Sequence, residues 1–193
     1  MAKLYFNYST MNAGKSTSLL QAAYNYREQG MHVLLITAAI DTRGPQKKIS
    51  SRIGLNDKAE TFFDNTDLFE LIHKYNEKKK ISCVFIDECQ FLNQTQVWQL
   101  ARVVDDLQLP VMCYGLRVDF QGNAFAGSAA LLAICDEMRE VKTICKCGKK
   151  ATMVIRLDDE KKPVVDGEQI KIGGNDTYLS LCRKHWRQSF FGH

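Results

Sequence analysis

The stretch Ser9-Thr10-Met11-Asn12-Ala13-Gly14-Lys15-Ser16 carries the residue types that hold nucleotide phosphates. It fits the pattern G-x-x-x-x-G-K-[ST], except that Ser9 replaces the leading glycine. A glycine-containing turn that opens a helix directs backbone N–H groups and the positive end of the helix dipole at an anion. Lys15 can then reach the terminal phosphates, and the Ser16 hydroxyl can bind Mg²⁺. The sequence predicts a phosphate site here, provided that the backbone at Ser9 has a negative φ.

A second candidate site is the carboxylate pair Asp87-Glu88, which ends an apolar run. Asp87 has the position of an acid that holds Mg²⁺ through its water shell, and Glu88 could polarise the O–H of a nucleophile. Each motif alone has an ordinary explanation, a strand-to-helix turn for the first and a solvated acidic pair for the second. Together in one sheet they predict the binding of a nucleoside triphosphate.

A third group of candidate residues lies in the last quarter of the chain: Cys145, Cys147, Cys182 and His185. Three thiols and one imidazole form a closed tetrahedral set that is typical of structural zinc. The C-x-x-H half has ordinary spacing, whereas the C-x-C half is tighter than usual and is followed by Gly148. Two incidental cysteine pairs are the alternative. Because no ligand position is left for a reacting water, we expect the metal to stabilise this region and not to do chemistry.

The elements that must position these residues alternate between strand and helix. Strand patterns cover residues 3–8, 32–37, 81–86 and 110–114, and helix patterns cover 15–29, 66–79 and 94–107, with Thr66 as the expected N-cap of the second helix. Alternation of this kind builds a mostly parallel sheet with helices on both faces. The predicted fold class is therefore α/β.

The pattern changes near Val141. Short β-rich pieces follow at 141–144, 151–156 and 177–181, and the stretch 158–174, called the polar segment below, is rich in charge and glycine. The sequence thus predicts two parts: a nucleotide-binding α/β core at residues 1–140 and a small zinc-binding module at residues 141–193.

Composition excludes several other classes of protein. The chain has 193 residues and a mass of 22.0 kDa, and its 45% hydrophobic and 25% charged residues are typical of a globular protein and exclude disorder. Seven cysteines exclude a fully paired disulfide scaffold, and Cys83 and Cys113 lie in apolar runs. The net charge of +4 is dispersed and predicts no nucleic-acid face. The N-terminus has no long apolar run, so we expect no membrane span and a cytoplasmic protein.

These motifs together resemble the type II thymidine kinases, the cytosolic thymidine kinases of bacteria and animals, and specifically their bacterial branch. The likeness covers nearly the whole chain. It includes the segments STMNAGKST, IDTRG, DECQF, CYGLRVDFQG and IGGNDTYLSLCRKH.

The resemblance implies a RecA-like P-loop core and a zinc ribbon-like module whose lasso loop closes over thymine. It implies transfer of the ATP γ-phosphoryl group to the 5′-hydroxyl of thymidine to give dTMP, with ATP, Mg²⁺ and structural Zn²⁺ bound. It further implies inhibition by dTTP and a homotetramer, whereas the charge and the apolar pattern of the chain indicate neither nucleic acid nor a membrane as partner.

The resemblance also implies residue roles. Glu88 is the expected proton acceptor, and Lys15 and Arg43 complete the catalytic set. The expected nucleotide-binding residues are Ser9, Thr10, Met11, Asn12, Ala13, Gly14, Lys15, Ser16, Thr17, Asp87, Glu88, Cys89 and Gln90. The expected substrate-binding residues are Met11, Asp41, Arg43, Leu116, Phe120, Phe125, Ile172, Gly173 and Tyr178. The zinc ligands are Cys145, Cys147, Cys182 and His185. The animal branch has glycine at position 9, a C-x-x-C pair and cysteine at position 185.

Two alternative functions come from other classes. A RecA-like ATPase whose zinc module acts on nucleic acid requires a basic or aromatic strand-binding face, and the sequence shows none. A catalytically silent nucleotide-binding module would lack a base, and Glu88 argues against it.

Overall fold

A six-stranded sheet forms the centre of the computed structural model, which describes residues 1–39, 47–171 and 177–192. All neighbouring strands in it are parallel, which confirms the predicted α/β class. In spatial order the strands are β5 (Glu60–Phe62), β2 (Val33–Ala38), β6 (Cys83–Asp87), β7 (Val111–Leu116), β1 (Leu4–Ser9) and β8 (Glu137–Glu140).

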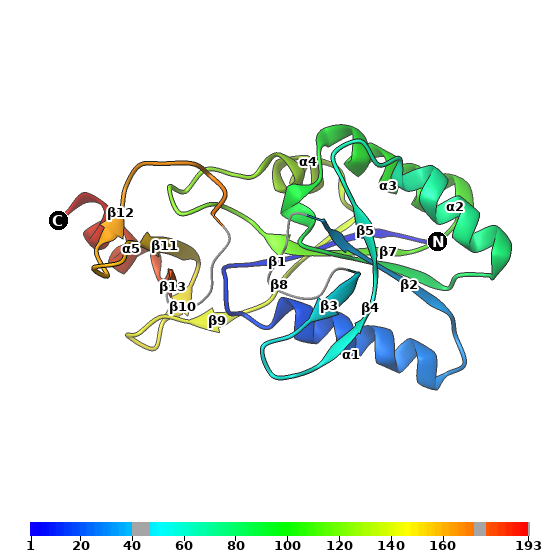
Figure 1. The fold of residues 1–193 in the computed structure, drawn as a ribbon, viewed down its shortest axis with the longest axis horizontal. Helices are drawn as coiled ribbons and strands as arrows, with labels where there is room; N and C mark the ends of the chain where they lie inside the picture. Colours follow the sequence, from blue (N-terminus) through cyan, green and yellow to red (C-terminus); the bar gives the residue numbers. More distant parts are fainter. Residues whose placement is uncertain (40–46, 172–176, 193) are drawn as a thin grey trace.

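Helices cover both faces of this sheet (Figure 1). One face carries α1 (Lys15–Glu28), and the other carries α2 (Leu68–Lys78), α3 (Gln94–Leu107) and α4 (Ala126–Ile134). Successive side chains of a strand point to opposite faces. In β2, Leu34 and Ile36 therefore pack in the core beneath α2 and α3, while Val33 and Leu35 pack against α1. This burial on both faces explains the continuous apolar runs of the central strands.

A short antiparallel hairpin, β3 (Lys48–Ser50) and β4 (Asn56–Lys58), lies on the α1 side of the sheet (Figure 1). Its buried residue Ile49 joins the core around α1. No sequence pattern predicts this hairpin, because its strands are three residues long and mostly polar.

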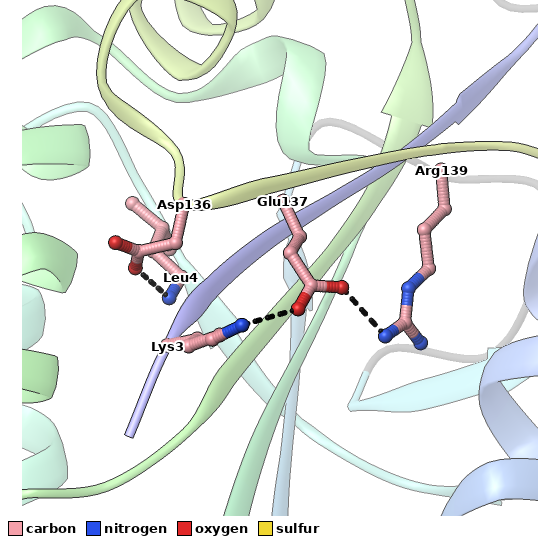
Figure 2. Close-up of polar contacts among 5 residues, drawn as sticks. All are labelled: Lys3, Leu4, Asp136, Glu137 and Arg139. Atoms are coloured by element: carbon pink, nitrogen blue, oxygen red, sulfur yellow. Dashed lines mark hydrogen bonds and ion pairs between the residues drawn. The ribbon is translucent and has the colours of Figure 1, made fainter. Parts of the chain in front are cut away.

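The edge strand β8 is held to β1 by charged side chains (Figure 2). The Asp136 carboxylate accepts a hydrogen bond from the Leu4 backbone N–H at 2.7 Å. Glu137 pairs with Lys3 at 2.6 Å and with Arg139 at 2.8 Å. Short, charged edge strands resist pairing with other chains, so these residues both attach β8 and protect the edge.

The last part of the chain consists of small antiparallel pieces (Figure 1). Strands β9 (Thr143–Ile144) and β10 (Lys150–Ala151) form one pair. Strands β12 (Pro163–Val164), β11 (Met153–Leu157) and β13 (Tyr178–Leu181) form a second sheet, and α5 (Arg183–Phe191) follows.

Two expected element boundaries are wrong. Asp67, not Thr66, caps α2, because its carboxylate accepts the Glu70 backbone N–H while the Thr66 hydroxyl accepts that of Phe63. The strand expected at 141–144 is only the two-residue β9 (Thr143–Ile144), and the strand before it, β8, already ends at Glu140 in the central sheet. The charged sequence of β8 gives no strand signal, and its pairing with β1 decides its conformation.

No helix in the described part of the chain has the length and apolar composition that crossing a membrane requires.

We predict that Asn93→Ala destabilises the protein by about 1 kcal/mol or more, since Asn93 and Gln96 form a capping box at the start of α3. Urea unfolding measures the loss. Gln94→Ala is the matched control, because Gln94 is exposed in the same turn and has no role in the cap. An equal loss in both variants would contradict the assigned role of the cap.

Candidate active site

The loop after β1 is shaped for an anion. Asn12 and Gly14 have φ values of 63° and 81°, and Gly14 is the N-cap of α1. Glycine is the residue best suited to this left-handed conformation. The backbone N–H groups of the first turn of α1 lack intrahelical partners and can bind phosphate oxygens.

Ser9 lies in strand β1 and not in the left-handed region, because the described residues other than glycine with positive φ do not include it. Its hydroxyl donates a hydrogen bond to the Val141 carbonyl, which ties the loop to the end of β8. The backbone at position 9 therefore does not need a positive φ, and serine fits where the motif has glycine.

Lys15, Ser16 and Asp87 come together where β1 and β6 end. The buried Lys15 ammonium donates to the Thr10 carbonyl at 2.7 Å, across the loop. The Ser16 hydroxyl donates to the Asp87 carboxylate at 2.9 Å. Burial and the neighbouring Glu88 charge raise the pKa of Asp87 to about 7, although the bond from Ser16 opposes the rise. A bound cation would favour the charged form of this carboxylate.

A cavity of about 500 Å³ lies over this loop. It is lined by loop residues from Met11 to Thr17, by Asp87 and Glu88, and by Lys48 to Ile53 of the β3–β4 hairpin. The hairpin residues were not among the predicted site residues, and their signal in the sequence is limited to the polar triplet Ser50-Ser51-Arg52. Ser9, Thr10 and Cys89 do not line this cavity, and Gln90 lines a different one.

A second, narrower cavity of about 60 Å³ adjoins the first. Met11, Glu88 and Leu116 line both cavities. All the expected substrate-binding residues that the structure describes line the second one: Met11, Leu116, Phe120, Phe125 and Tyr178. Asp41, Arg43, Ile172 and Gly173 lie outside the described residues.

Sequence reasoning missed several other residues of the second cavity. Phe91, Val118 and Asp119 belong to segments that carried the family resemblance, which is the signal that could have found them. Gln169, Ile170 and Lys171 come from the polar segment, whose glycines and length favour a loop that closes over a ligand, but no signal singles out these three residues. The remaining wall residue that was missed is Val154.

The described end of the polar segment is fastened at three successive points. Arg156 donates to the Glu168 carbonyl at 2.7 Å, and the Gln169 amide donates to the buried Asp119 carboxylate at 2.8 Å. The Tyr178 hydroxyl donates to the Lys171 carbonyl at 2.7 Å. These bonds hold residues 168–171 beside the second cavity.

Comparisons with known proteins agree on one family. A family model described as thymidine kinase matches residues 2–186 of the chain. The chain belongs to the thymidine kinase family. This result confirms the family resemblance stated from the sequence.

Relatives within the family come from bacteria and match over nearly their whole length. The chain is 62% identical over 189 residues to a thymidine kinase of Ruegeria pomeroyi, with 98% of this chain and 96% of that one covered. It is 57% identical over 190 residues to a thymidine kinase of Agrobacterium fabrum, with 98% of each chain covered. A thymidine kinase of Jannaschia sp. is 59% identical over 189 residues, with 98% and 97% covered.

In this thymidine kinase family member, the four expected zinc ligands lie together at the ends of β9 and β13 and on α5. The ligand atoms of Cys145, Cys147, Cys182 and His185 all lie within 4.8 Å of one another. The Cys145 Sγ to His185 Nδ1 distance is 3.2 Å, and Cys147 Sγ lies 3.9 Å from Cys182 Sγ. A tetrahedral zinc spaces such donors by about 3.3–3.8 Å. The donor set fits a zinc ion, and these two distances lie within about 0.1 Å of the range for a tetrahedral site.

We predict that the purified protein carries about one zinc per chain and that Cys182→Ser loses it. Removing a thiolate leaves an incomplete ligand set, and the variant should unfold at a lower temperature. Elemental analysis and the fluorescence of Trp186, which is buried on α5 beside the cluster, report the change.

Cys135→Ser is the matched control, because Cys135 is a free thiol at the end of α4 and is not part of the cluster. Active protein without zinc after careful purification would refute the prediction.

Proposed function

We propose that the protein transfers the γ-phosphoryl group of ATP to the 5′-hydroxyl of thymidine, giving ADP and dTMP. One observation carries this proposal: Glu88 lies in the wall shared by the phosphate-loop cavity and the narrow apolar cavity. A phosphoryl donor in the first and a nucleoside in the second would meet beside a carboxylate. Membership of the thymidine kinase family supports thymidine as the acceptor.

In this proposal residues 1–140 are a RecA-like P-loop core, and the loop from Ser9 to Ser16 holds the ATP phosphates. Lys15 offsets the phosphate charge next to the backbone N–H groups of the loop. Ser16 and Asp87 would hold Mg²⁺, which neutralises charge on the phosphate oxygens when bound. The hydrogen bond between these two side chains supports this role, because it shows that their oxygens lie close together.

The narrow cavity is the proposed thymidine site. Met11, Phe120, Val154 and Tyr178 pack together as an apolar cluster that suits a flat base and its methyl group. Residues 141–193 form the proposed zinc ribbon-like module, and the polar segment is its lasso loop. Backbone groups of such a loop can bond to thymine O2, N3–H and O4, which supports selection of the base without a diagnostic side chain.

The proposed reaction is a direct displacement. The thymidine O5′ forms a bond to the γ-phosphorus, the bond from that phosphorus to the β–γ bridging oxygen breaks, and ADP leaves. Glu88 accepts the hydroxyl proton, a role typically worth about 10²–10⁴ in rate. Because the transition state is loose, alignment and charge stabilisation by Lys15 and Arg43 supply most of the remaining catalysis.

Further proposals rest on the family resemblance. dTTP, as end product, inhibits the enzyme, and the adjoining cavities support this because dTTP combines a thymine nucleoside with a triphosphate. The enzyme works as a cytoplasmic homotetramer, which sedimentation of the purified protein would test.

Conversion of ATP to ADP, measured with and without thymidine, tests the proposed function. We expect ADP to form in proportion to dTMP and only when thymidine is present. ADP formation that responds to single-stranded DNA and not to thymidine would favour the ATPase alternative.

We predict that Glu88→Gln lowers turnover at least about 10²-fold and leaves nucleotide binding nearly intact, since the amide keeps the shape of the side chain but is not a base. Single-turnover rates and ATP binding constants separate the two effects. Lys15→Ala should instead weaken the use of ATP. A Gln variant with chemistry near that of the wild type would remove Glu88 from its assigned role.

We predict that the polar segment exchanges its amide hydrogens readily in the free protein and becomes protected when thymidine or dTTP binds. The narrow cavity requires this segment to move before a nucleoside enters, and Gly167 offers a hinge with a φ of 134°. Uridine should protect the amides of residues 158–171 less than thymidine does, because uridine has a 2′-hydroxyl and lacks the methyl group. Equal protection by both nucleosides would separate the segment from specificity.

A further inference from the structure

Glu88 is held in a backbone conformation that is unusual for its residue type. Its φ and ψ are 53° and 39°, in the left-handed region, and the 3₁₀ turn η1 (Cys89–Phe91) follows directly. Residues other than glycine are uncommon in this region and are stabilised there by the surrounding structure. The groups that stabilise this conformation must therefore lie around η1.

Two glycines on different elements allow the chain to pack closely against η1. A Cβ on Gly115 of β7 would lie 2.6 Å from Cys89 Sγ and 2.7 Å from Gln90 Oε1. A Cβ on Gly127 of α4 would lie 2.6 Å from the carbonyl oxygens of Cys89 and Leu92. Strand β7 and helix α4 thus approach the turn from two sides, and neither could do so with a larger residue.

The side chain of Gln90 connects this turn to Glu88 itself. Gln90 is only 3% exposed, and its Nε2 donates to Glu88 Oε2 at 2.6 Å. Its Oε1 accepts the backbone N–H of Leu116 at 2.9 Å. The Leu116 N–H can only donate, so Oε1 must face Leu116, and Nε2 must then face the carboxylate. A flipped amide would lose both bonds.

Leu116, whose backbone N–H bonds to Gln90, is itself held by a further hydrogen bond. The carbonyl of Leu116 accepts a hydrogen bond from the fully buried Ser128 hydroxyl at 2.5 Å. A chain of hydrogen bonds therefore runs from α4 through the end of β7 and Gln90 to Glu88. Its links measure 2.5 to 2.9 Å, and two of its four members, Ser128 and Gln90, are buried, so the chain restricts the rotamer of the carboxylate.

We propose that Gln90 is a positioning residue that orients Glu88 for proton transfer and does not bind the nucleotide. This inference rests on the proposed function of Glu88 as the base. A charge-assisted bond to one carboxylate oxygen leaves acceptor capacity for the substrate hydroxyl. Gln90 lines the narrow cavity and not the phosphate-loop cavity, which argues against the nucleotide contact expected from the family resemblance.

The test uses Gln90→Met, which keeps the length of the side chain and removes both hydrogen bonds, and Gln90→Glu, which keeps an acceptor for Leu116 and removes the donor to Glu88. We expect both to lower kcat about 10- to 100-fold, as misplacement of a catalytic group does, with KM for ATP and thymidine changed less than about threefold. A raised KM for ATP with kcat unchanged would overturn the inference.

A double-mutant cycle with Glu88→Gln decides whether Gln90 acts through Glu88. The double variant Glu88→Gln/Gln90→Met should be no slower than Glu88→Gln alone, within about twofold, because the base is already absent. If the double variant is slower than Glu88→Gln by the same factor by which Gln90→Met is slower than the wild type, the inference is overturned.

Gln96→Met is the matched control for the loss of a buried glutamine. Gln96 is 1% exposed, its amide donates to the carbonyls of Phe63 and Thr66, and it lines neither cavity. It should lose stability and keep kcat. Failure of both Gln90 variants to fold would assign Gln90 a structural role and overturn the inference. Wild-type protein that does not phosphorylate thymidine would instead refute the proposed function.

Discussion

The parallel pairing of β6, β7 and β1 is the constraint on which the candidate site depends. Parallel strands end at the same edge of a sheet, so the residues that follow them are brought together from distant parts of the chain. Ser9 pairs in register with Leu116, and Ile86 pairs with Cys113. A slip of one residue would turn every side chain of a strand to the opposite face. The apolar cores on both faces prevent such a slip and thereby fix where the loop, Asp87 and Glu88 meet.

The sequence predicts those parts of the fold whose signal is local. The helix predicted at residues 94–107 has those bounds in the structure, because the 3.6-residue periodicity is strong and Asn93 with Gln96 marks its start. Strand β8 has no such signal, since Glu137 and Arg139 are stabilised by pairing with β1 and with each other. The hairpin of β3 and β4 is missed for the same reason: only burial of Ile49 in the folded chain favours it.

The candidate site likewise has features that the local sequence predicts and features that only the folded chain determines. The loop from Ser9 to Ser16 is predictable, because a phosphate site built from backbone N–H groups requires a fixed spacing of glycine, lysine and hydroxyl. The orientation of the Gln90 amide is not predictable, because it depends on the Leu116 N–H, which lies on another strand. The fastening of residues 168–171 is likewise invisible in a polar sequence, since Asp119 and Arg156 meet it only after folding.

Hydrogen bonds connect the segments that carry the Cys/His cluster to the segments that line the narrow cavity, although no cluster residue lines the cavity. Trp186, one residue after His185, donates its indole N–H to the Phe120 carbonyl at 3.0 Å. Ser180, two residues before Cys182, donates to the Met11 carbonyl in the phosphate loop at 2.6 Å.

The cavity wall therefore comes partly from the core, through Met11 and Phe120, and partly from the C-terminal strands, through Val154 and Tyr178. The apolar cluster behind those strands is small, with six buried residues, two of which are cysteines of the Cys/His cluster. A core of this size cannot hold a binding wall rigid by burial alone. A metal bound to α5 and the preceding turns would supply that rigidity, so a site remote from the reacting atoms would still determine the shape in which a nucleoside binds.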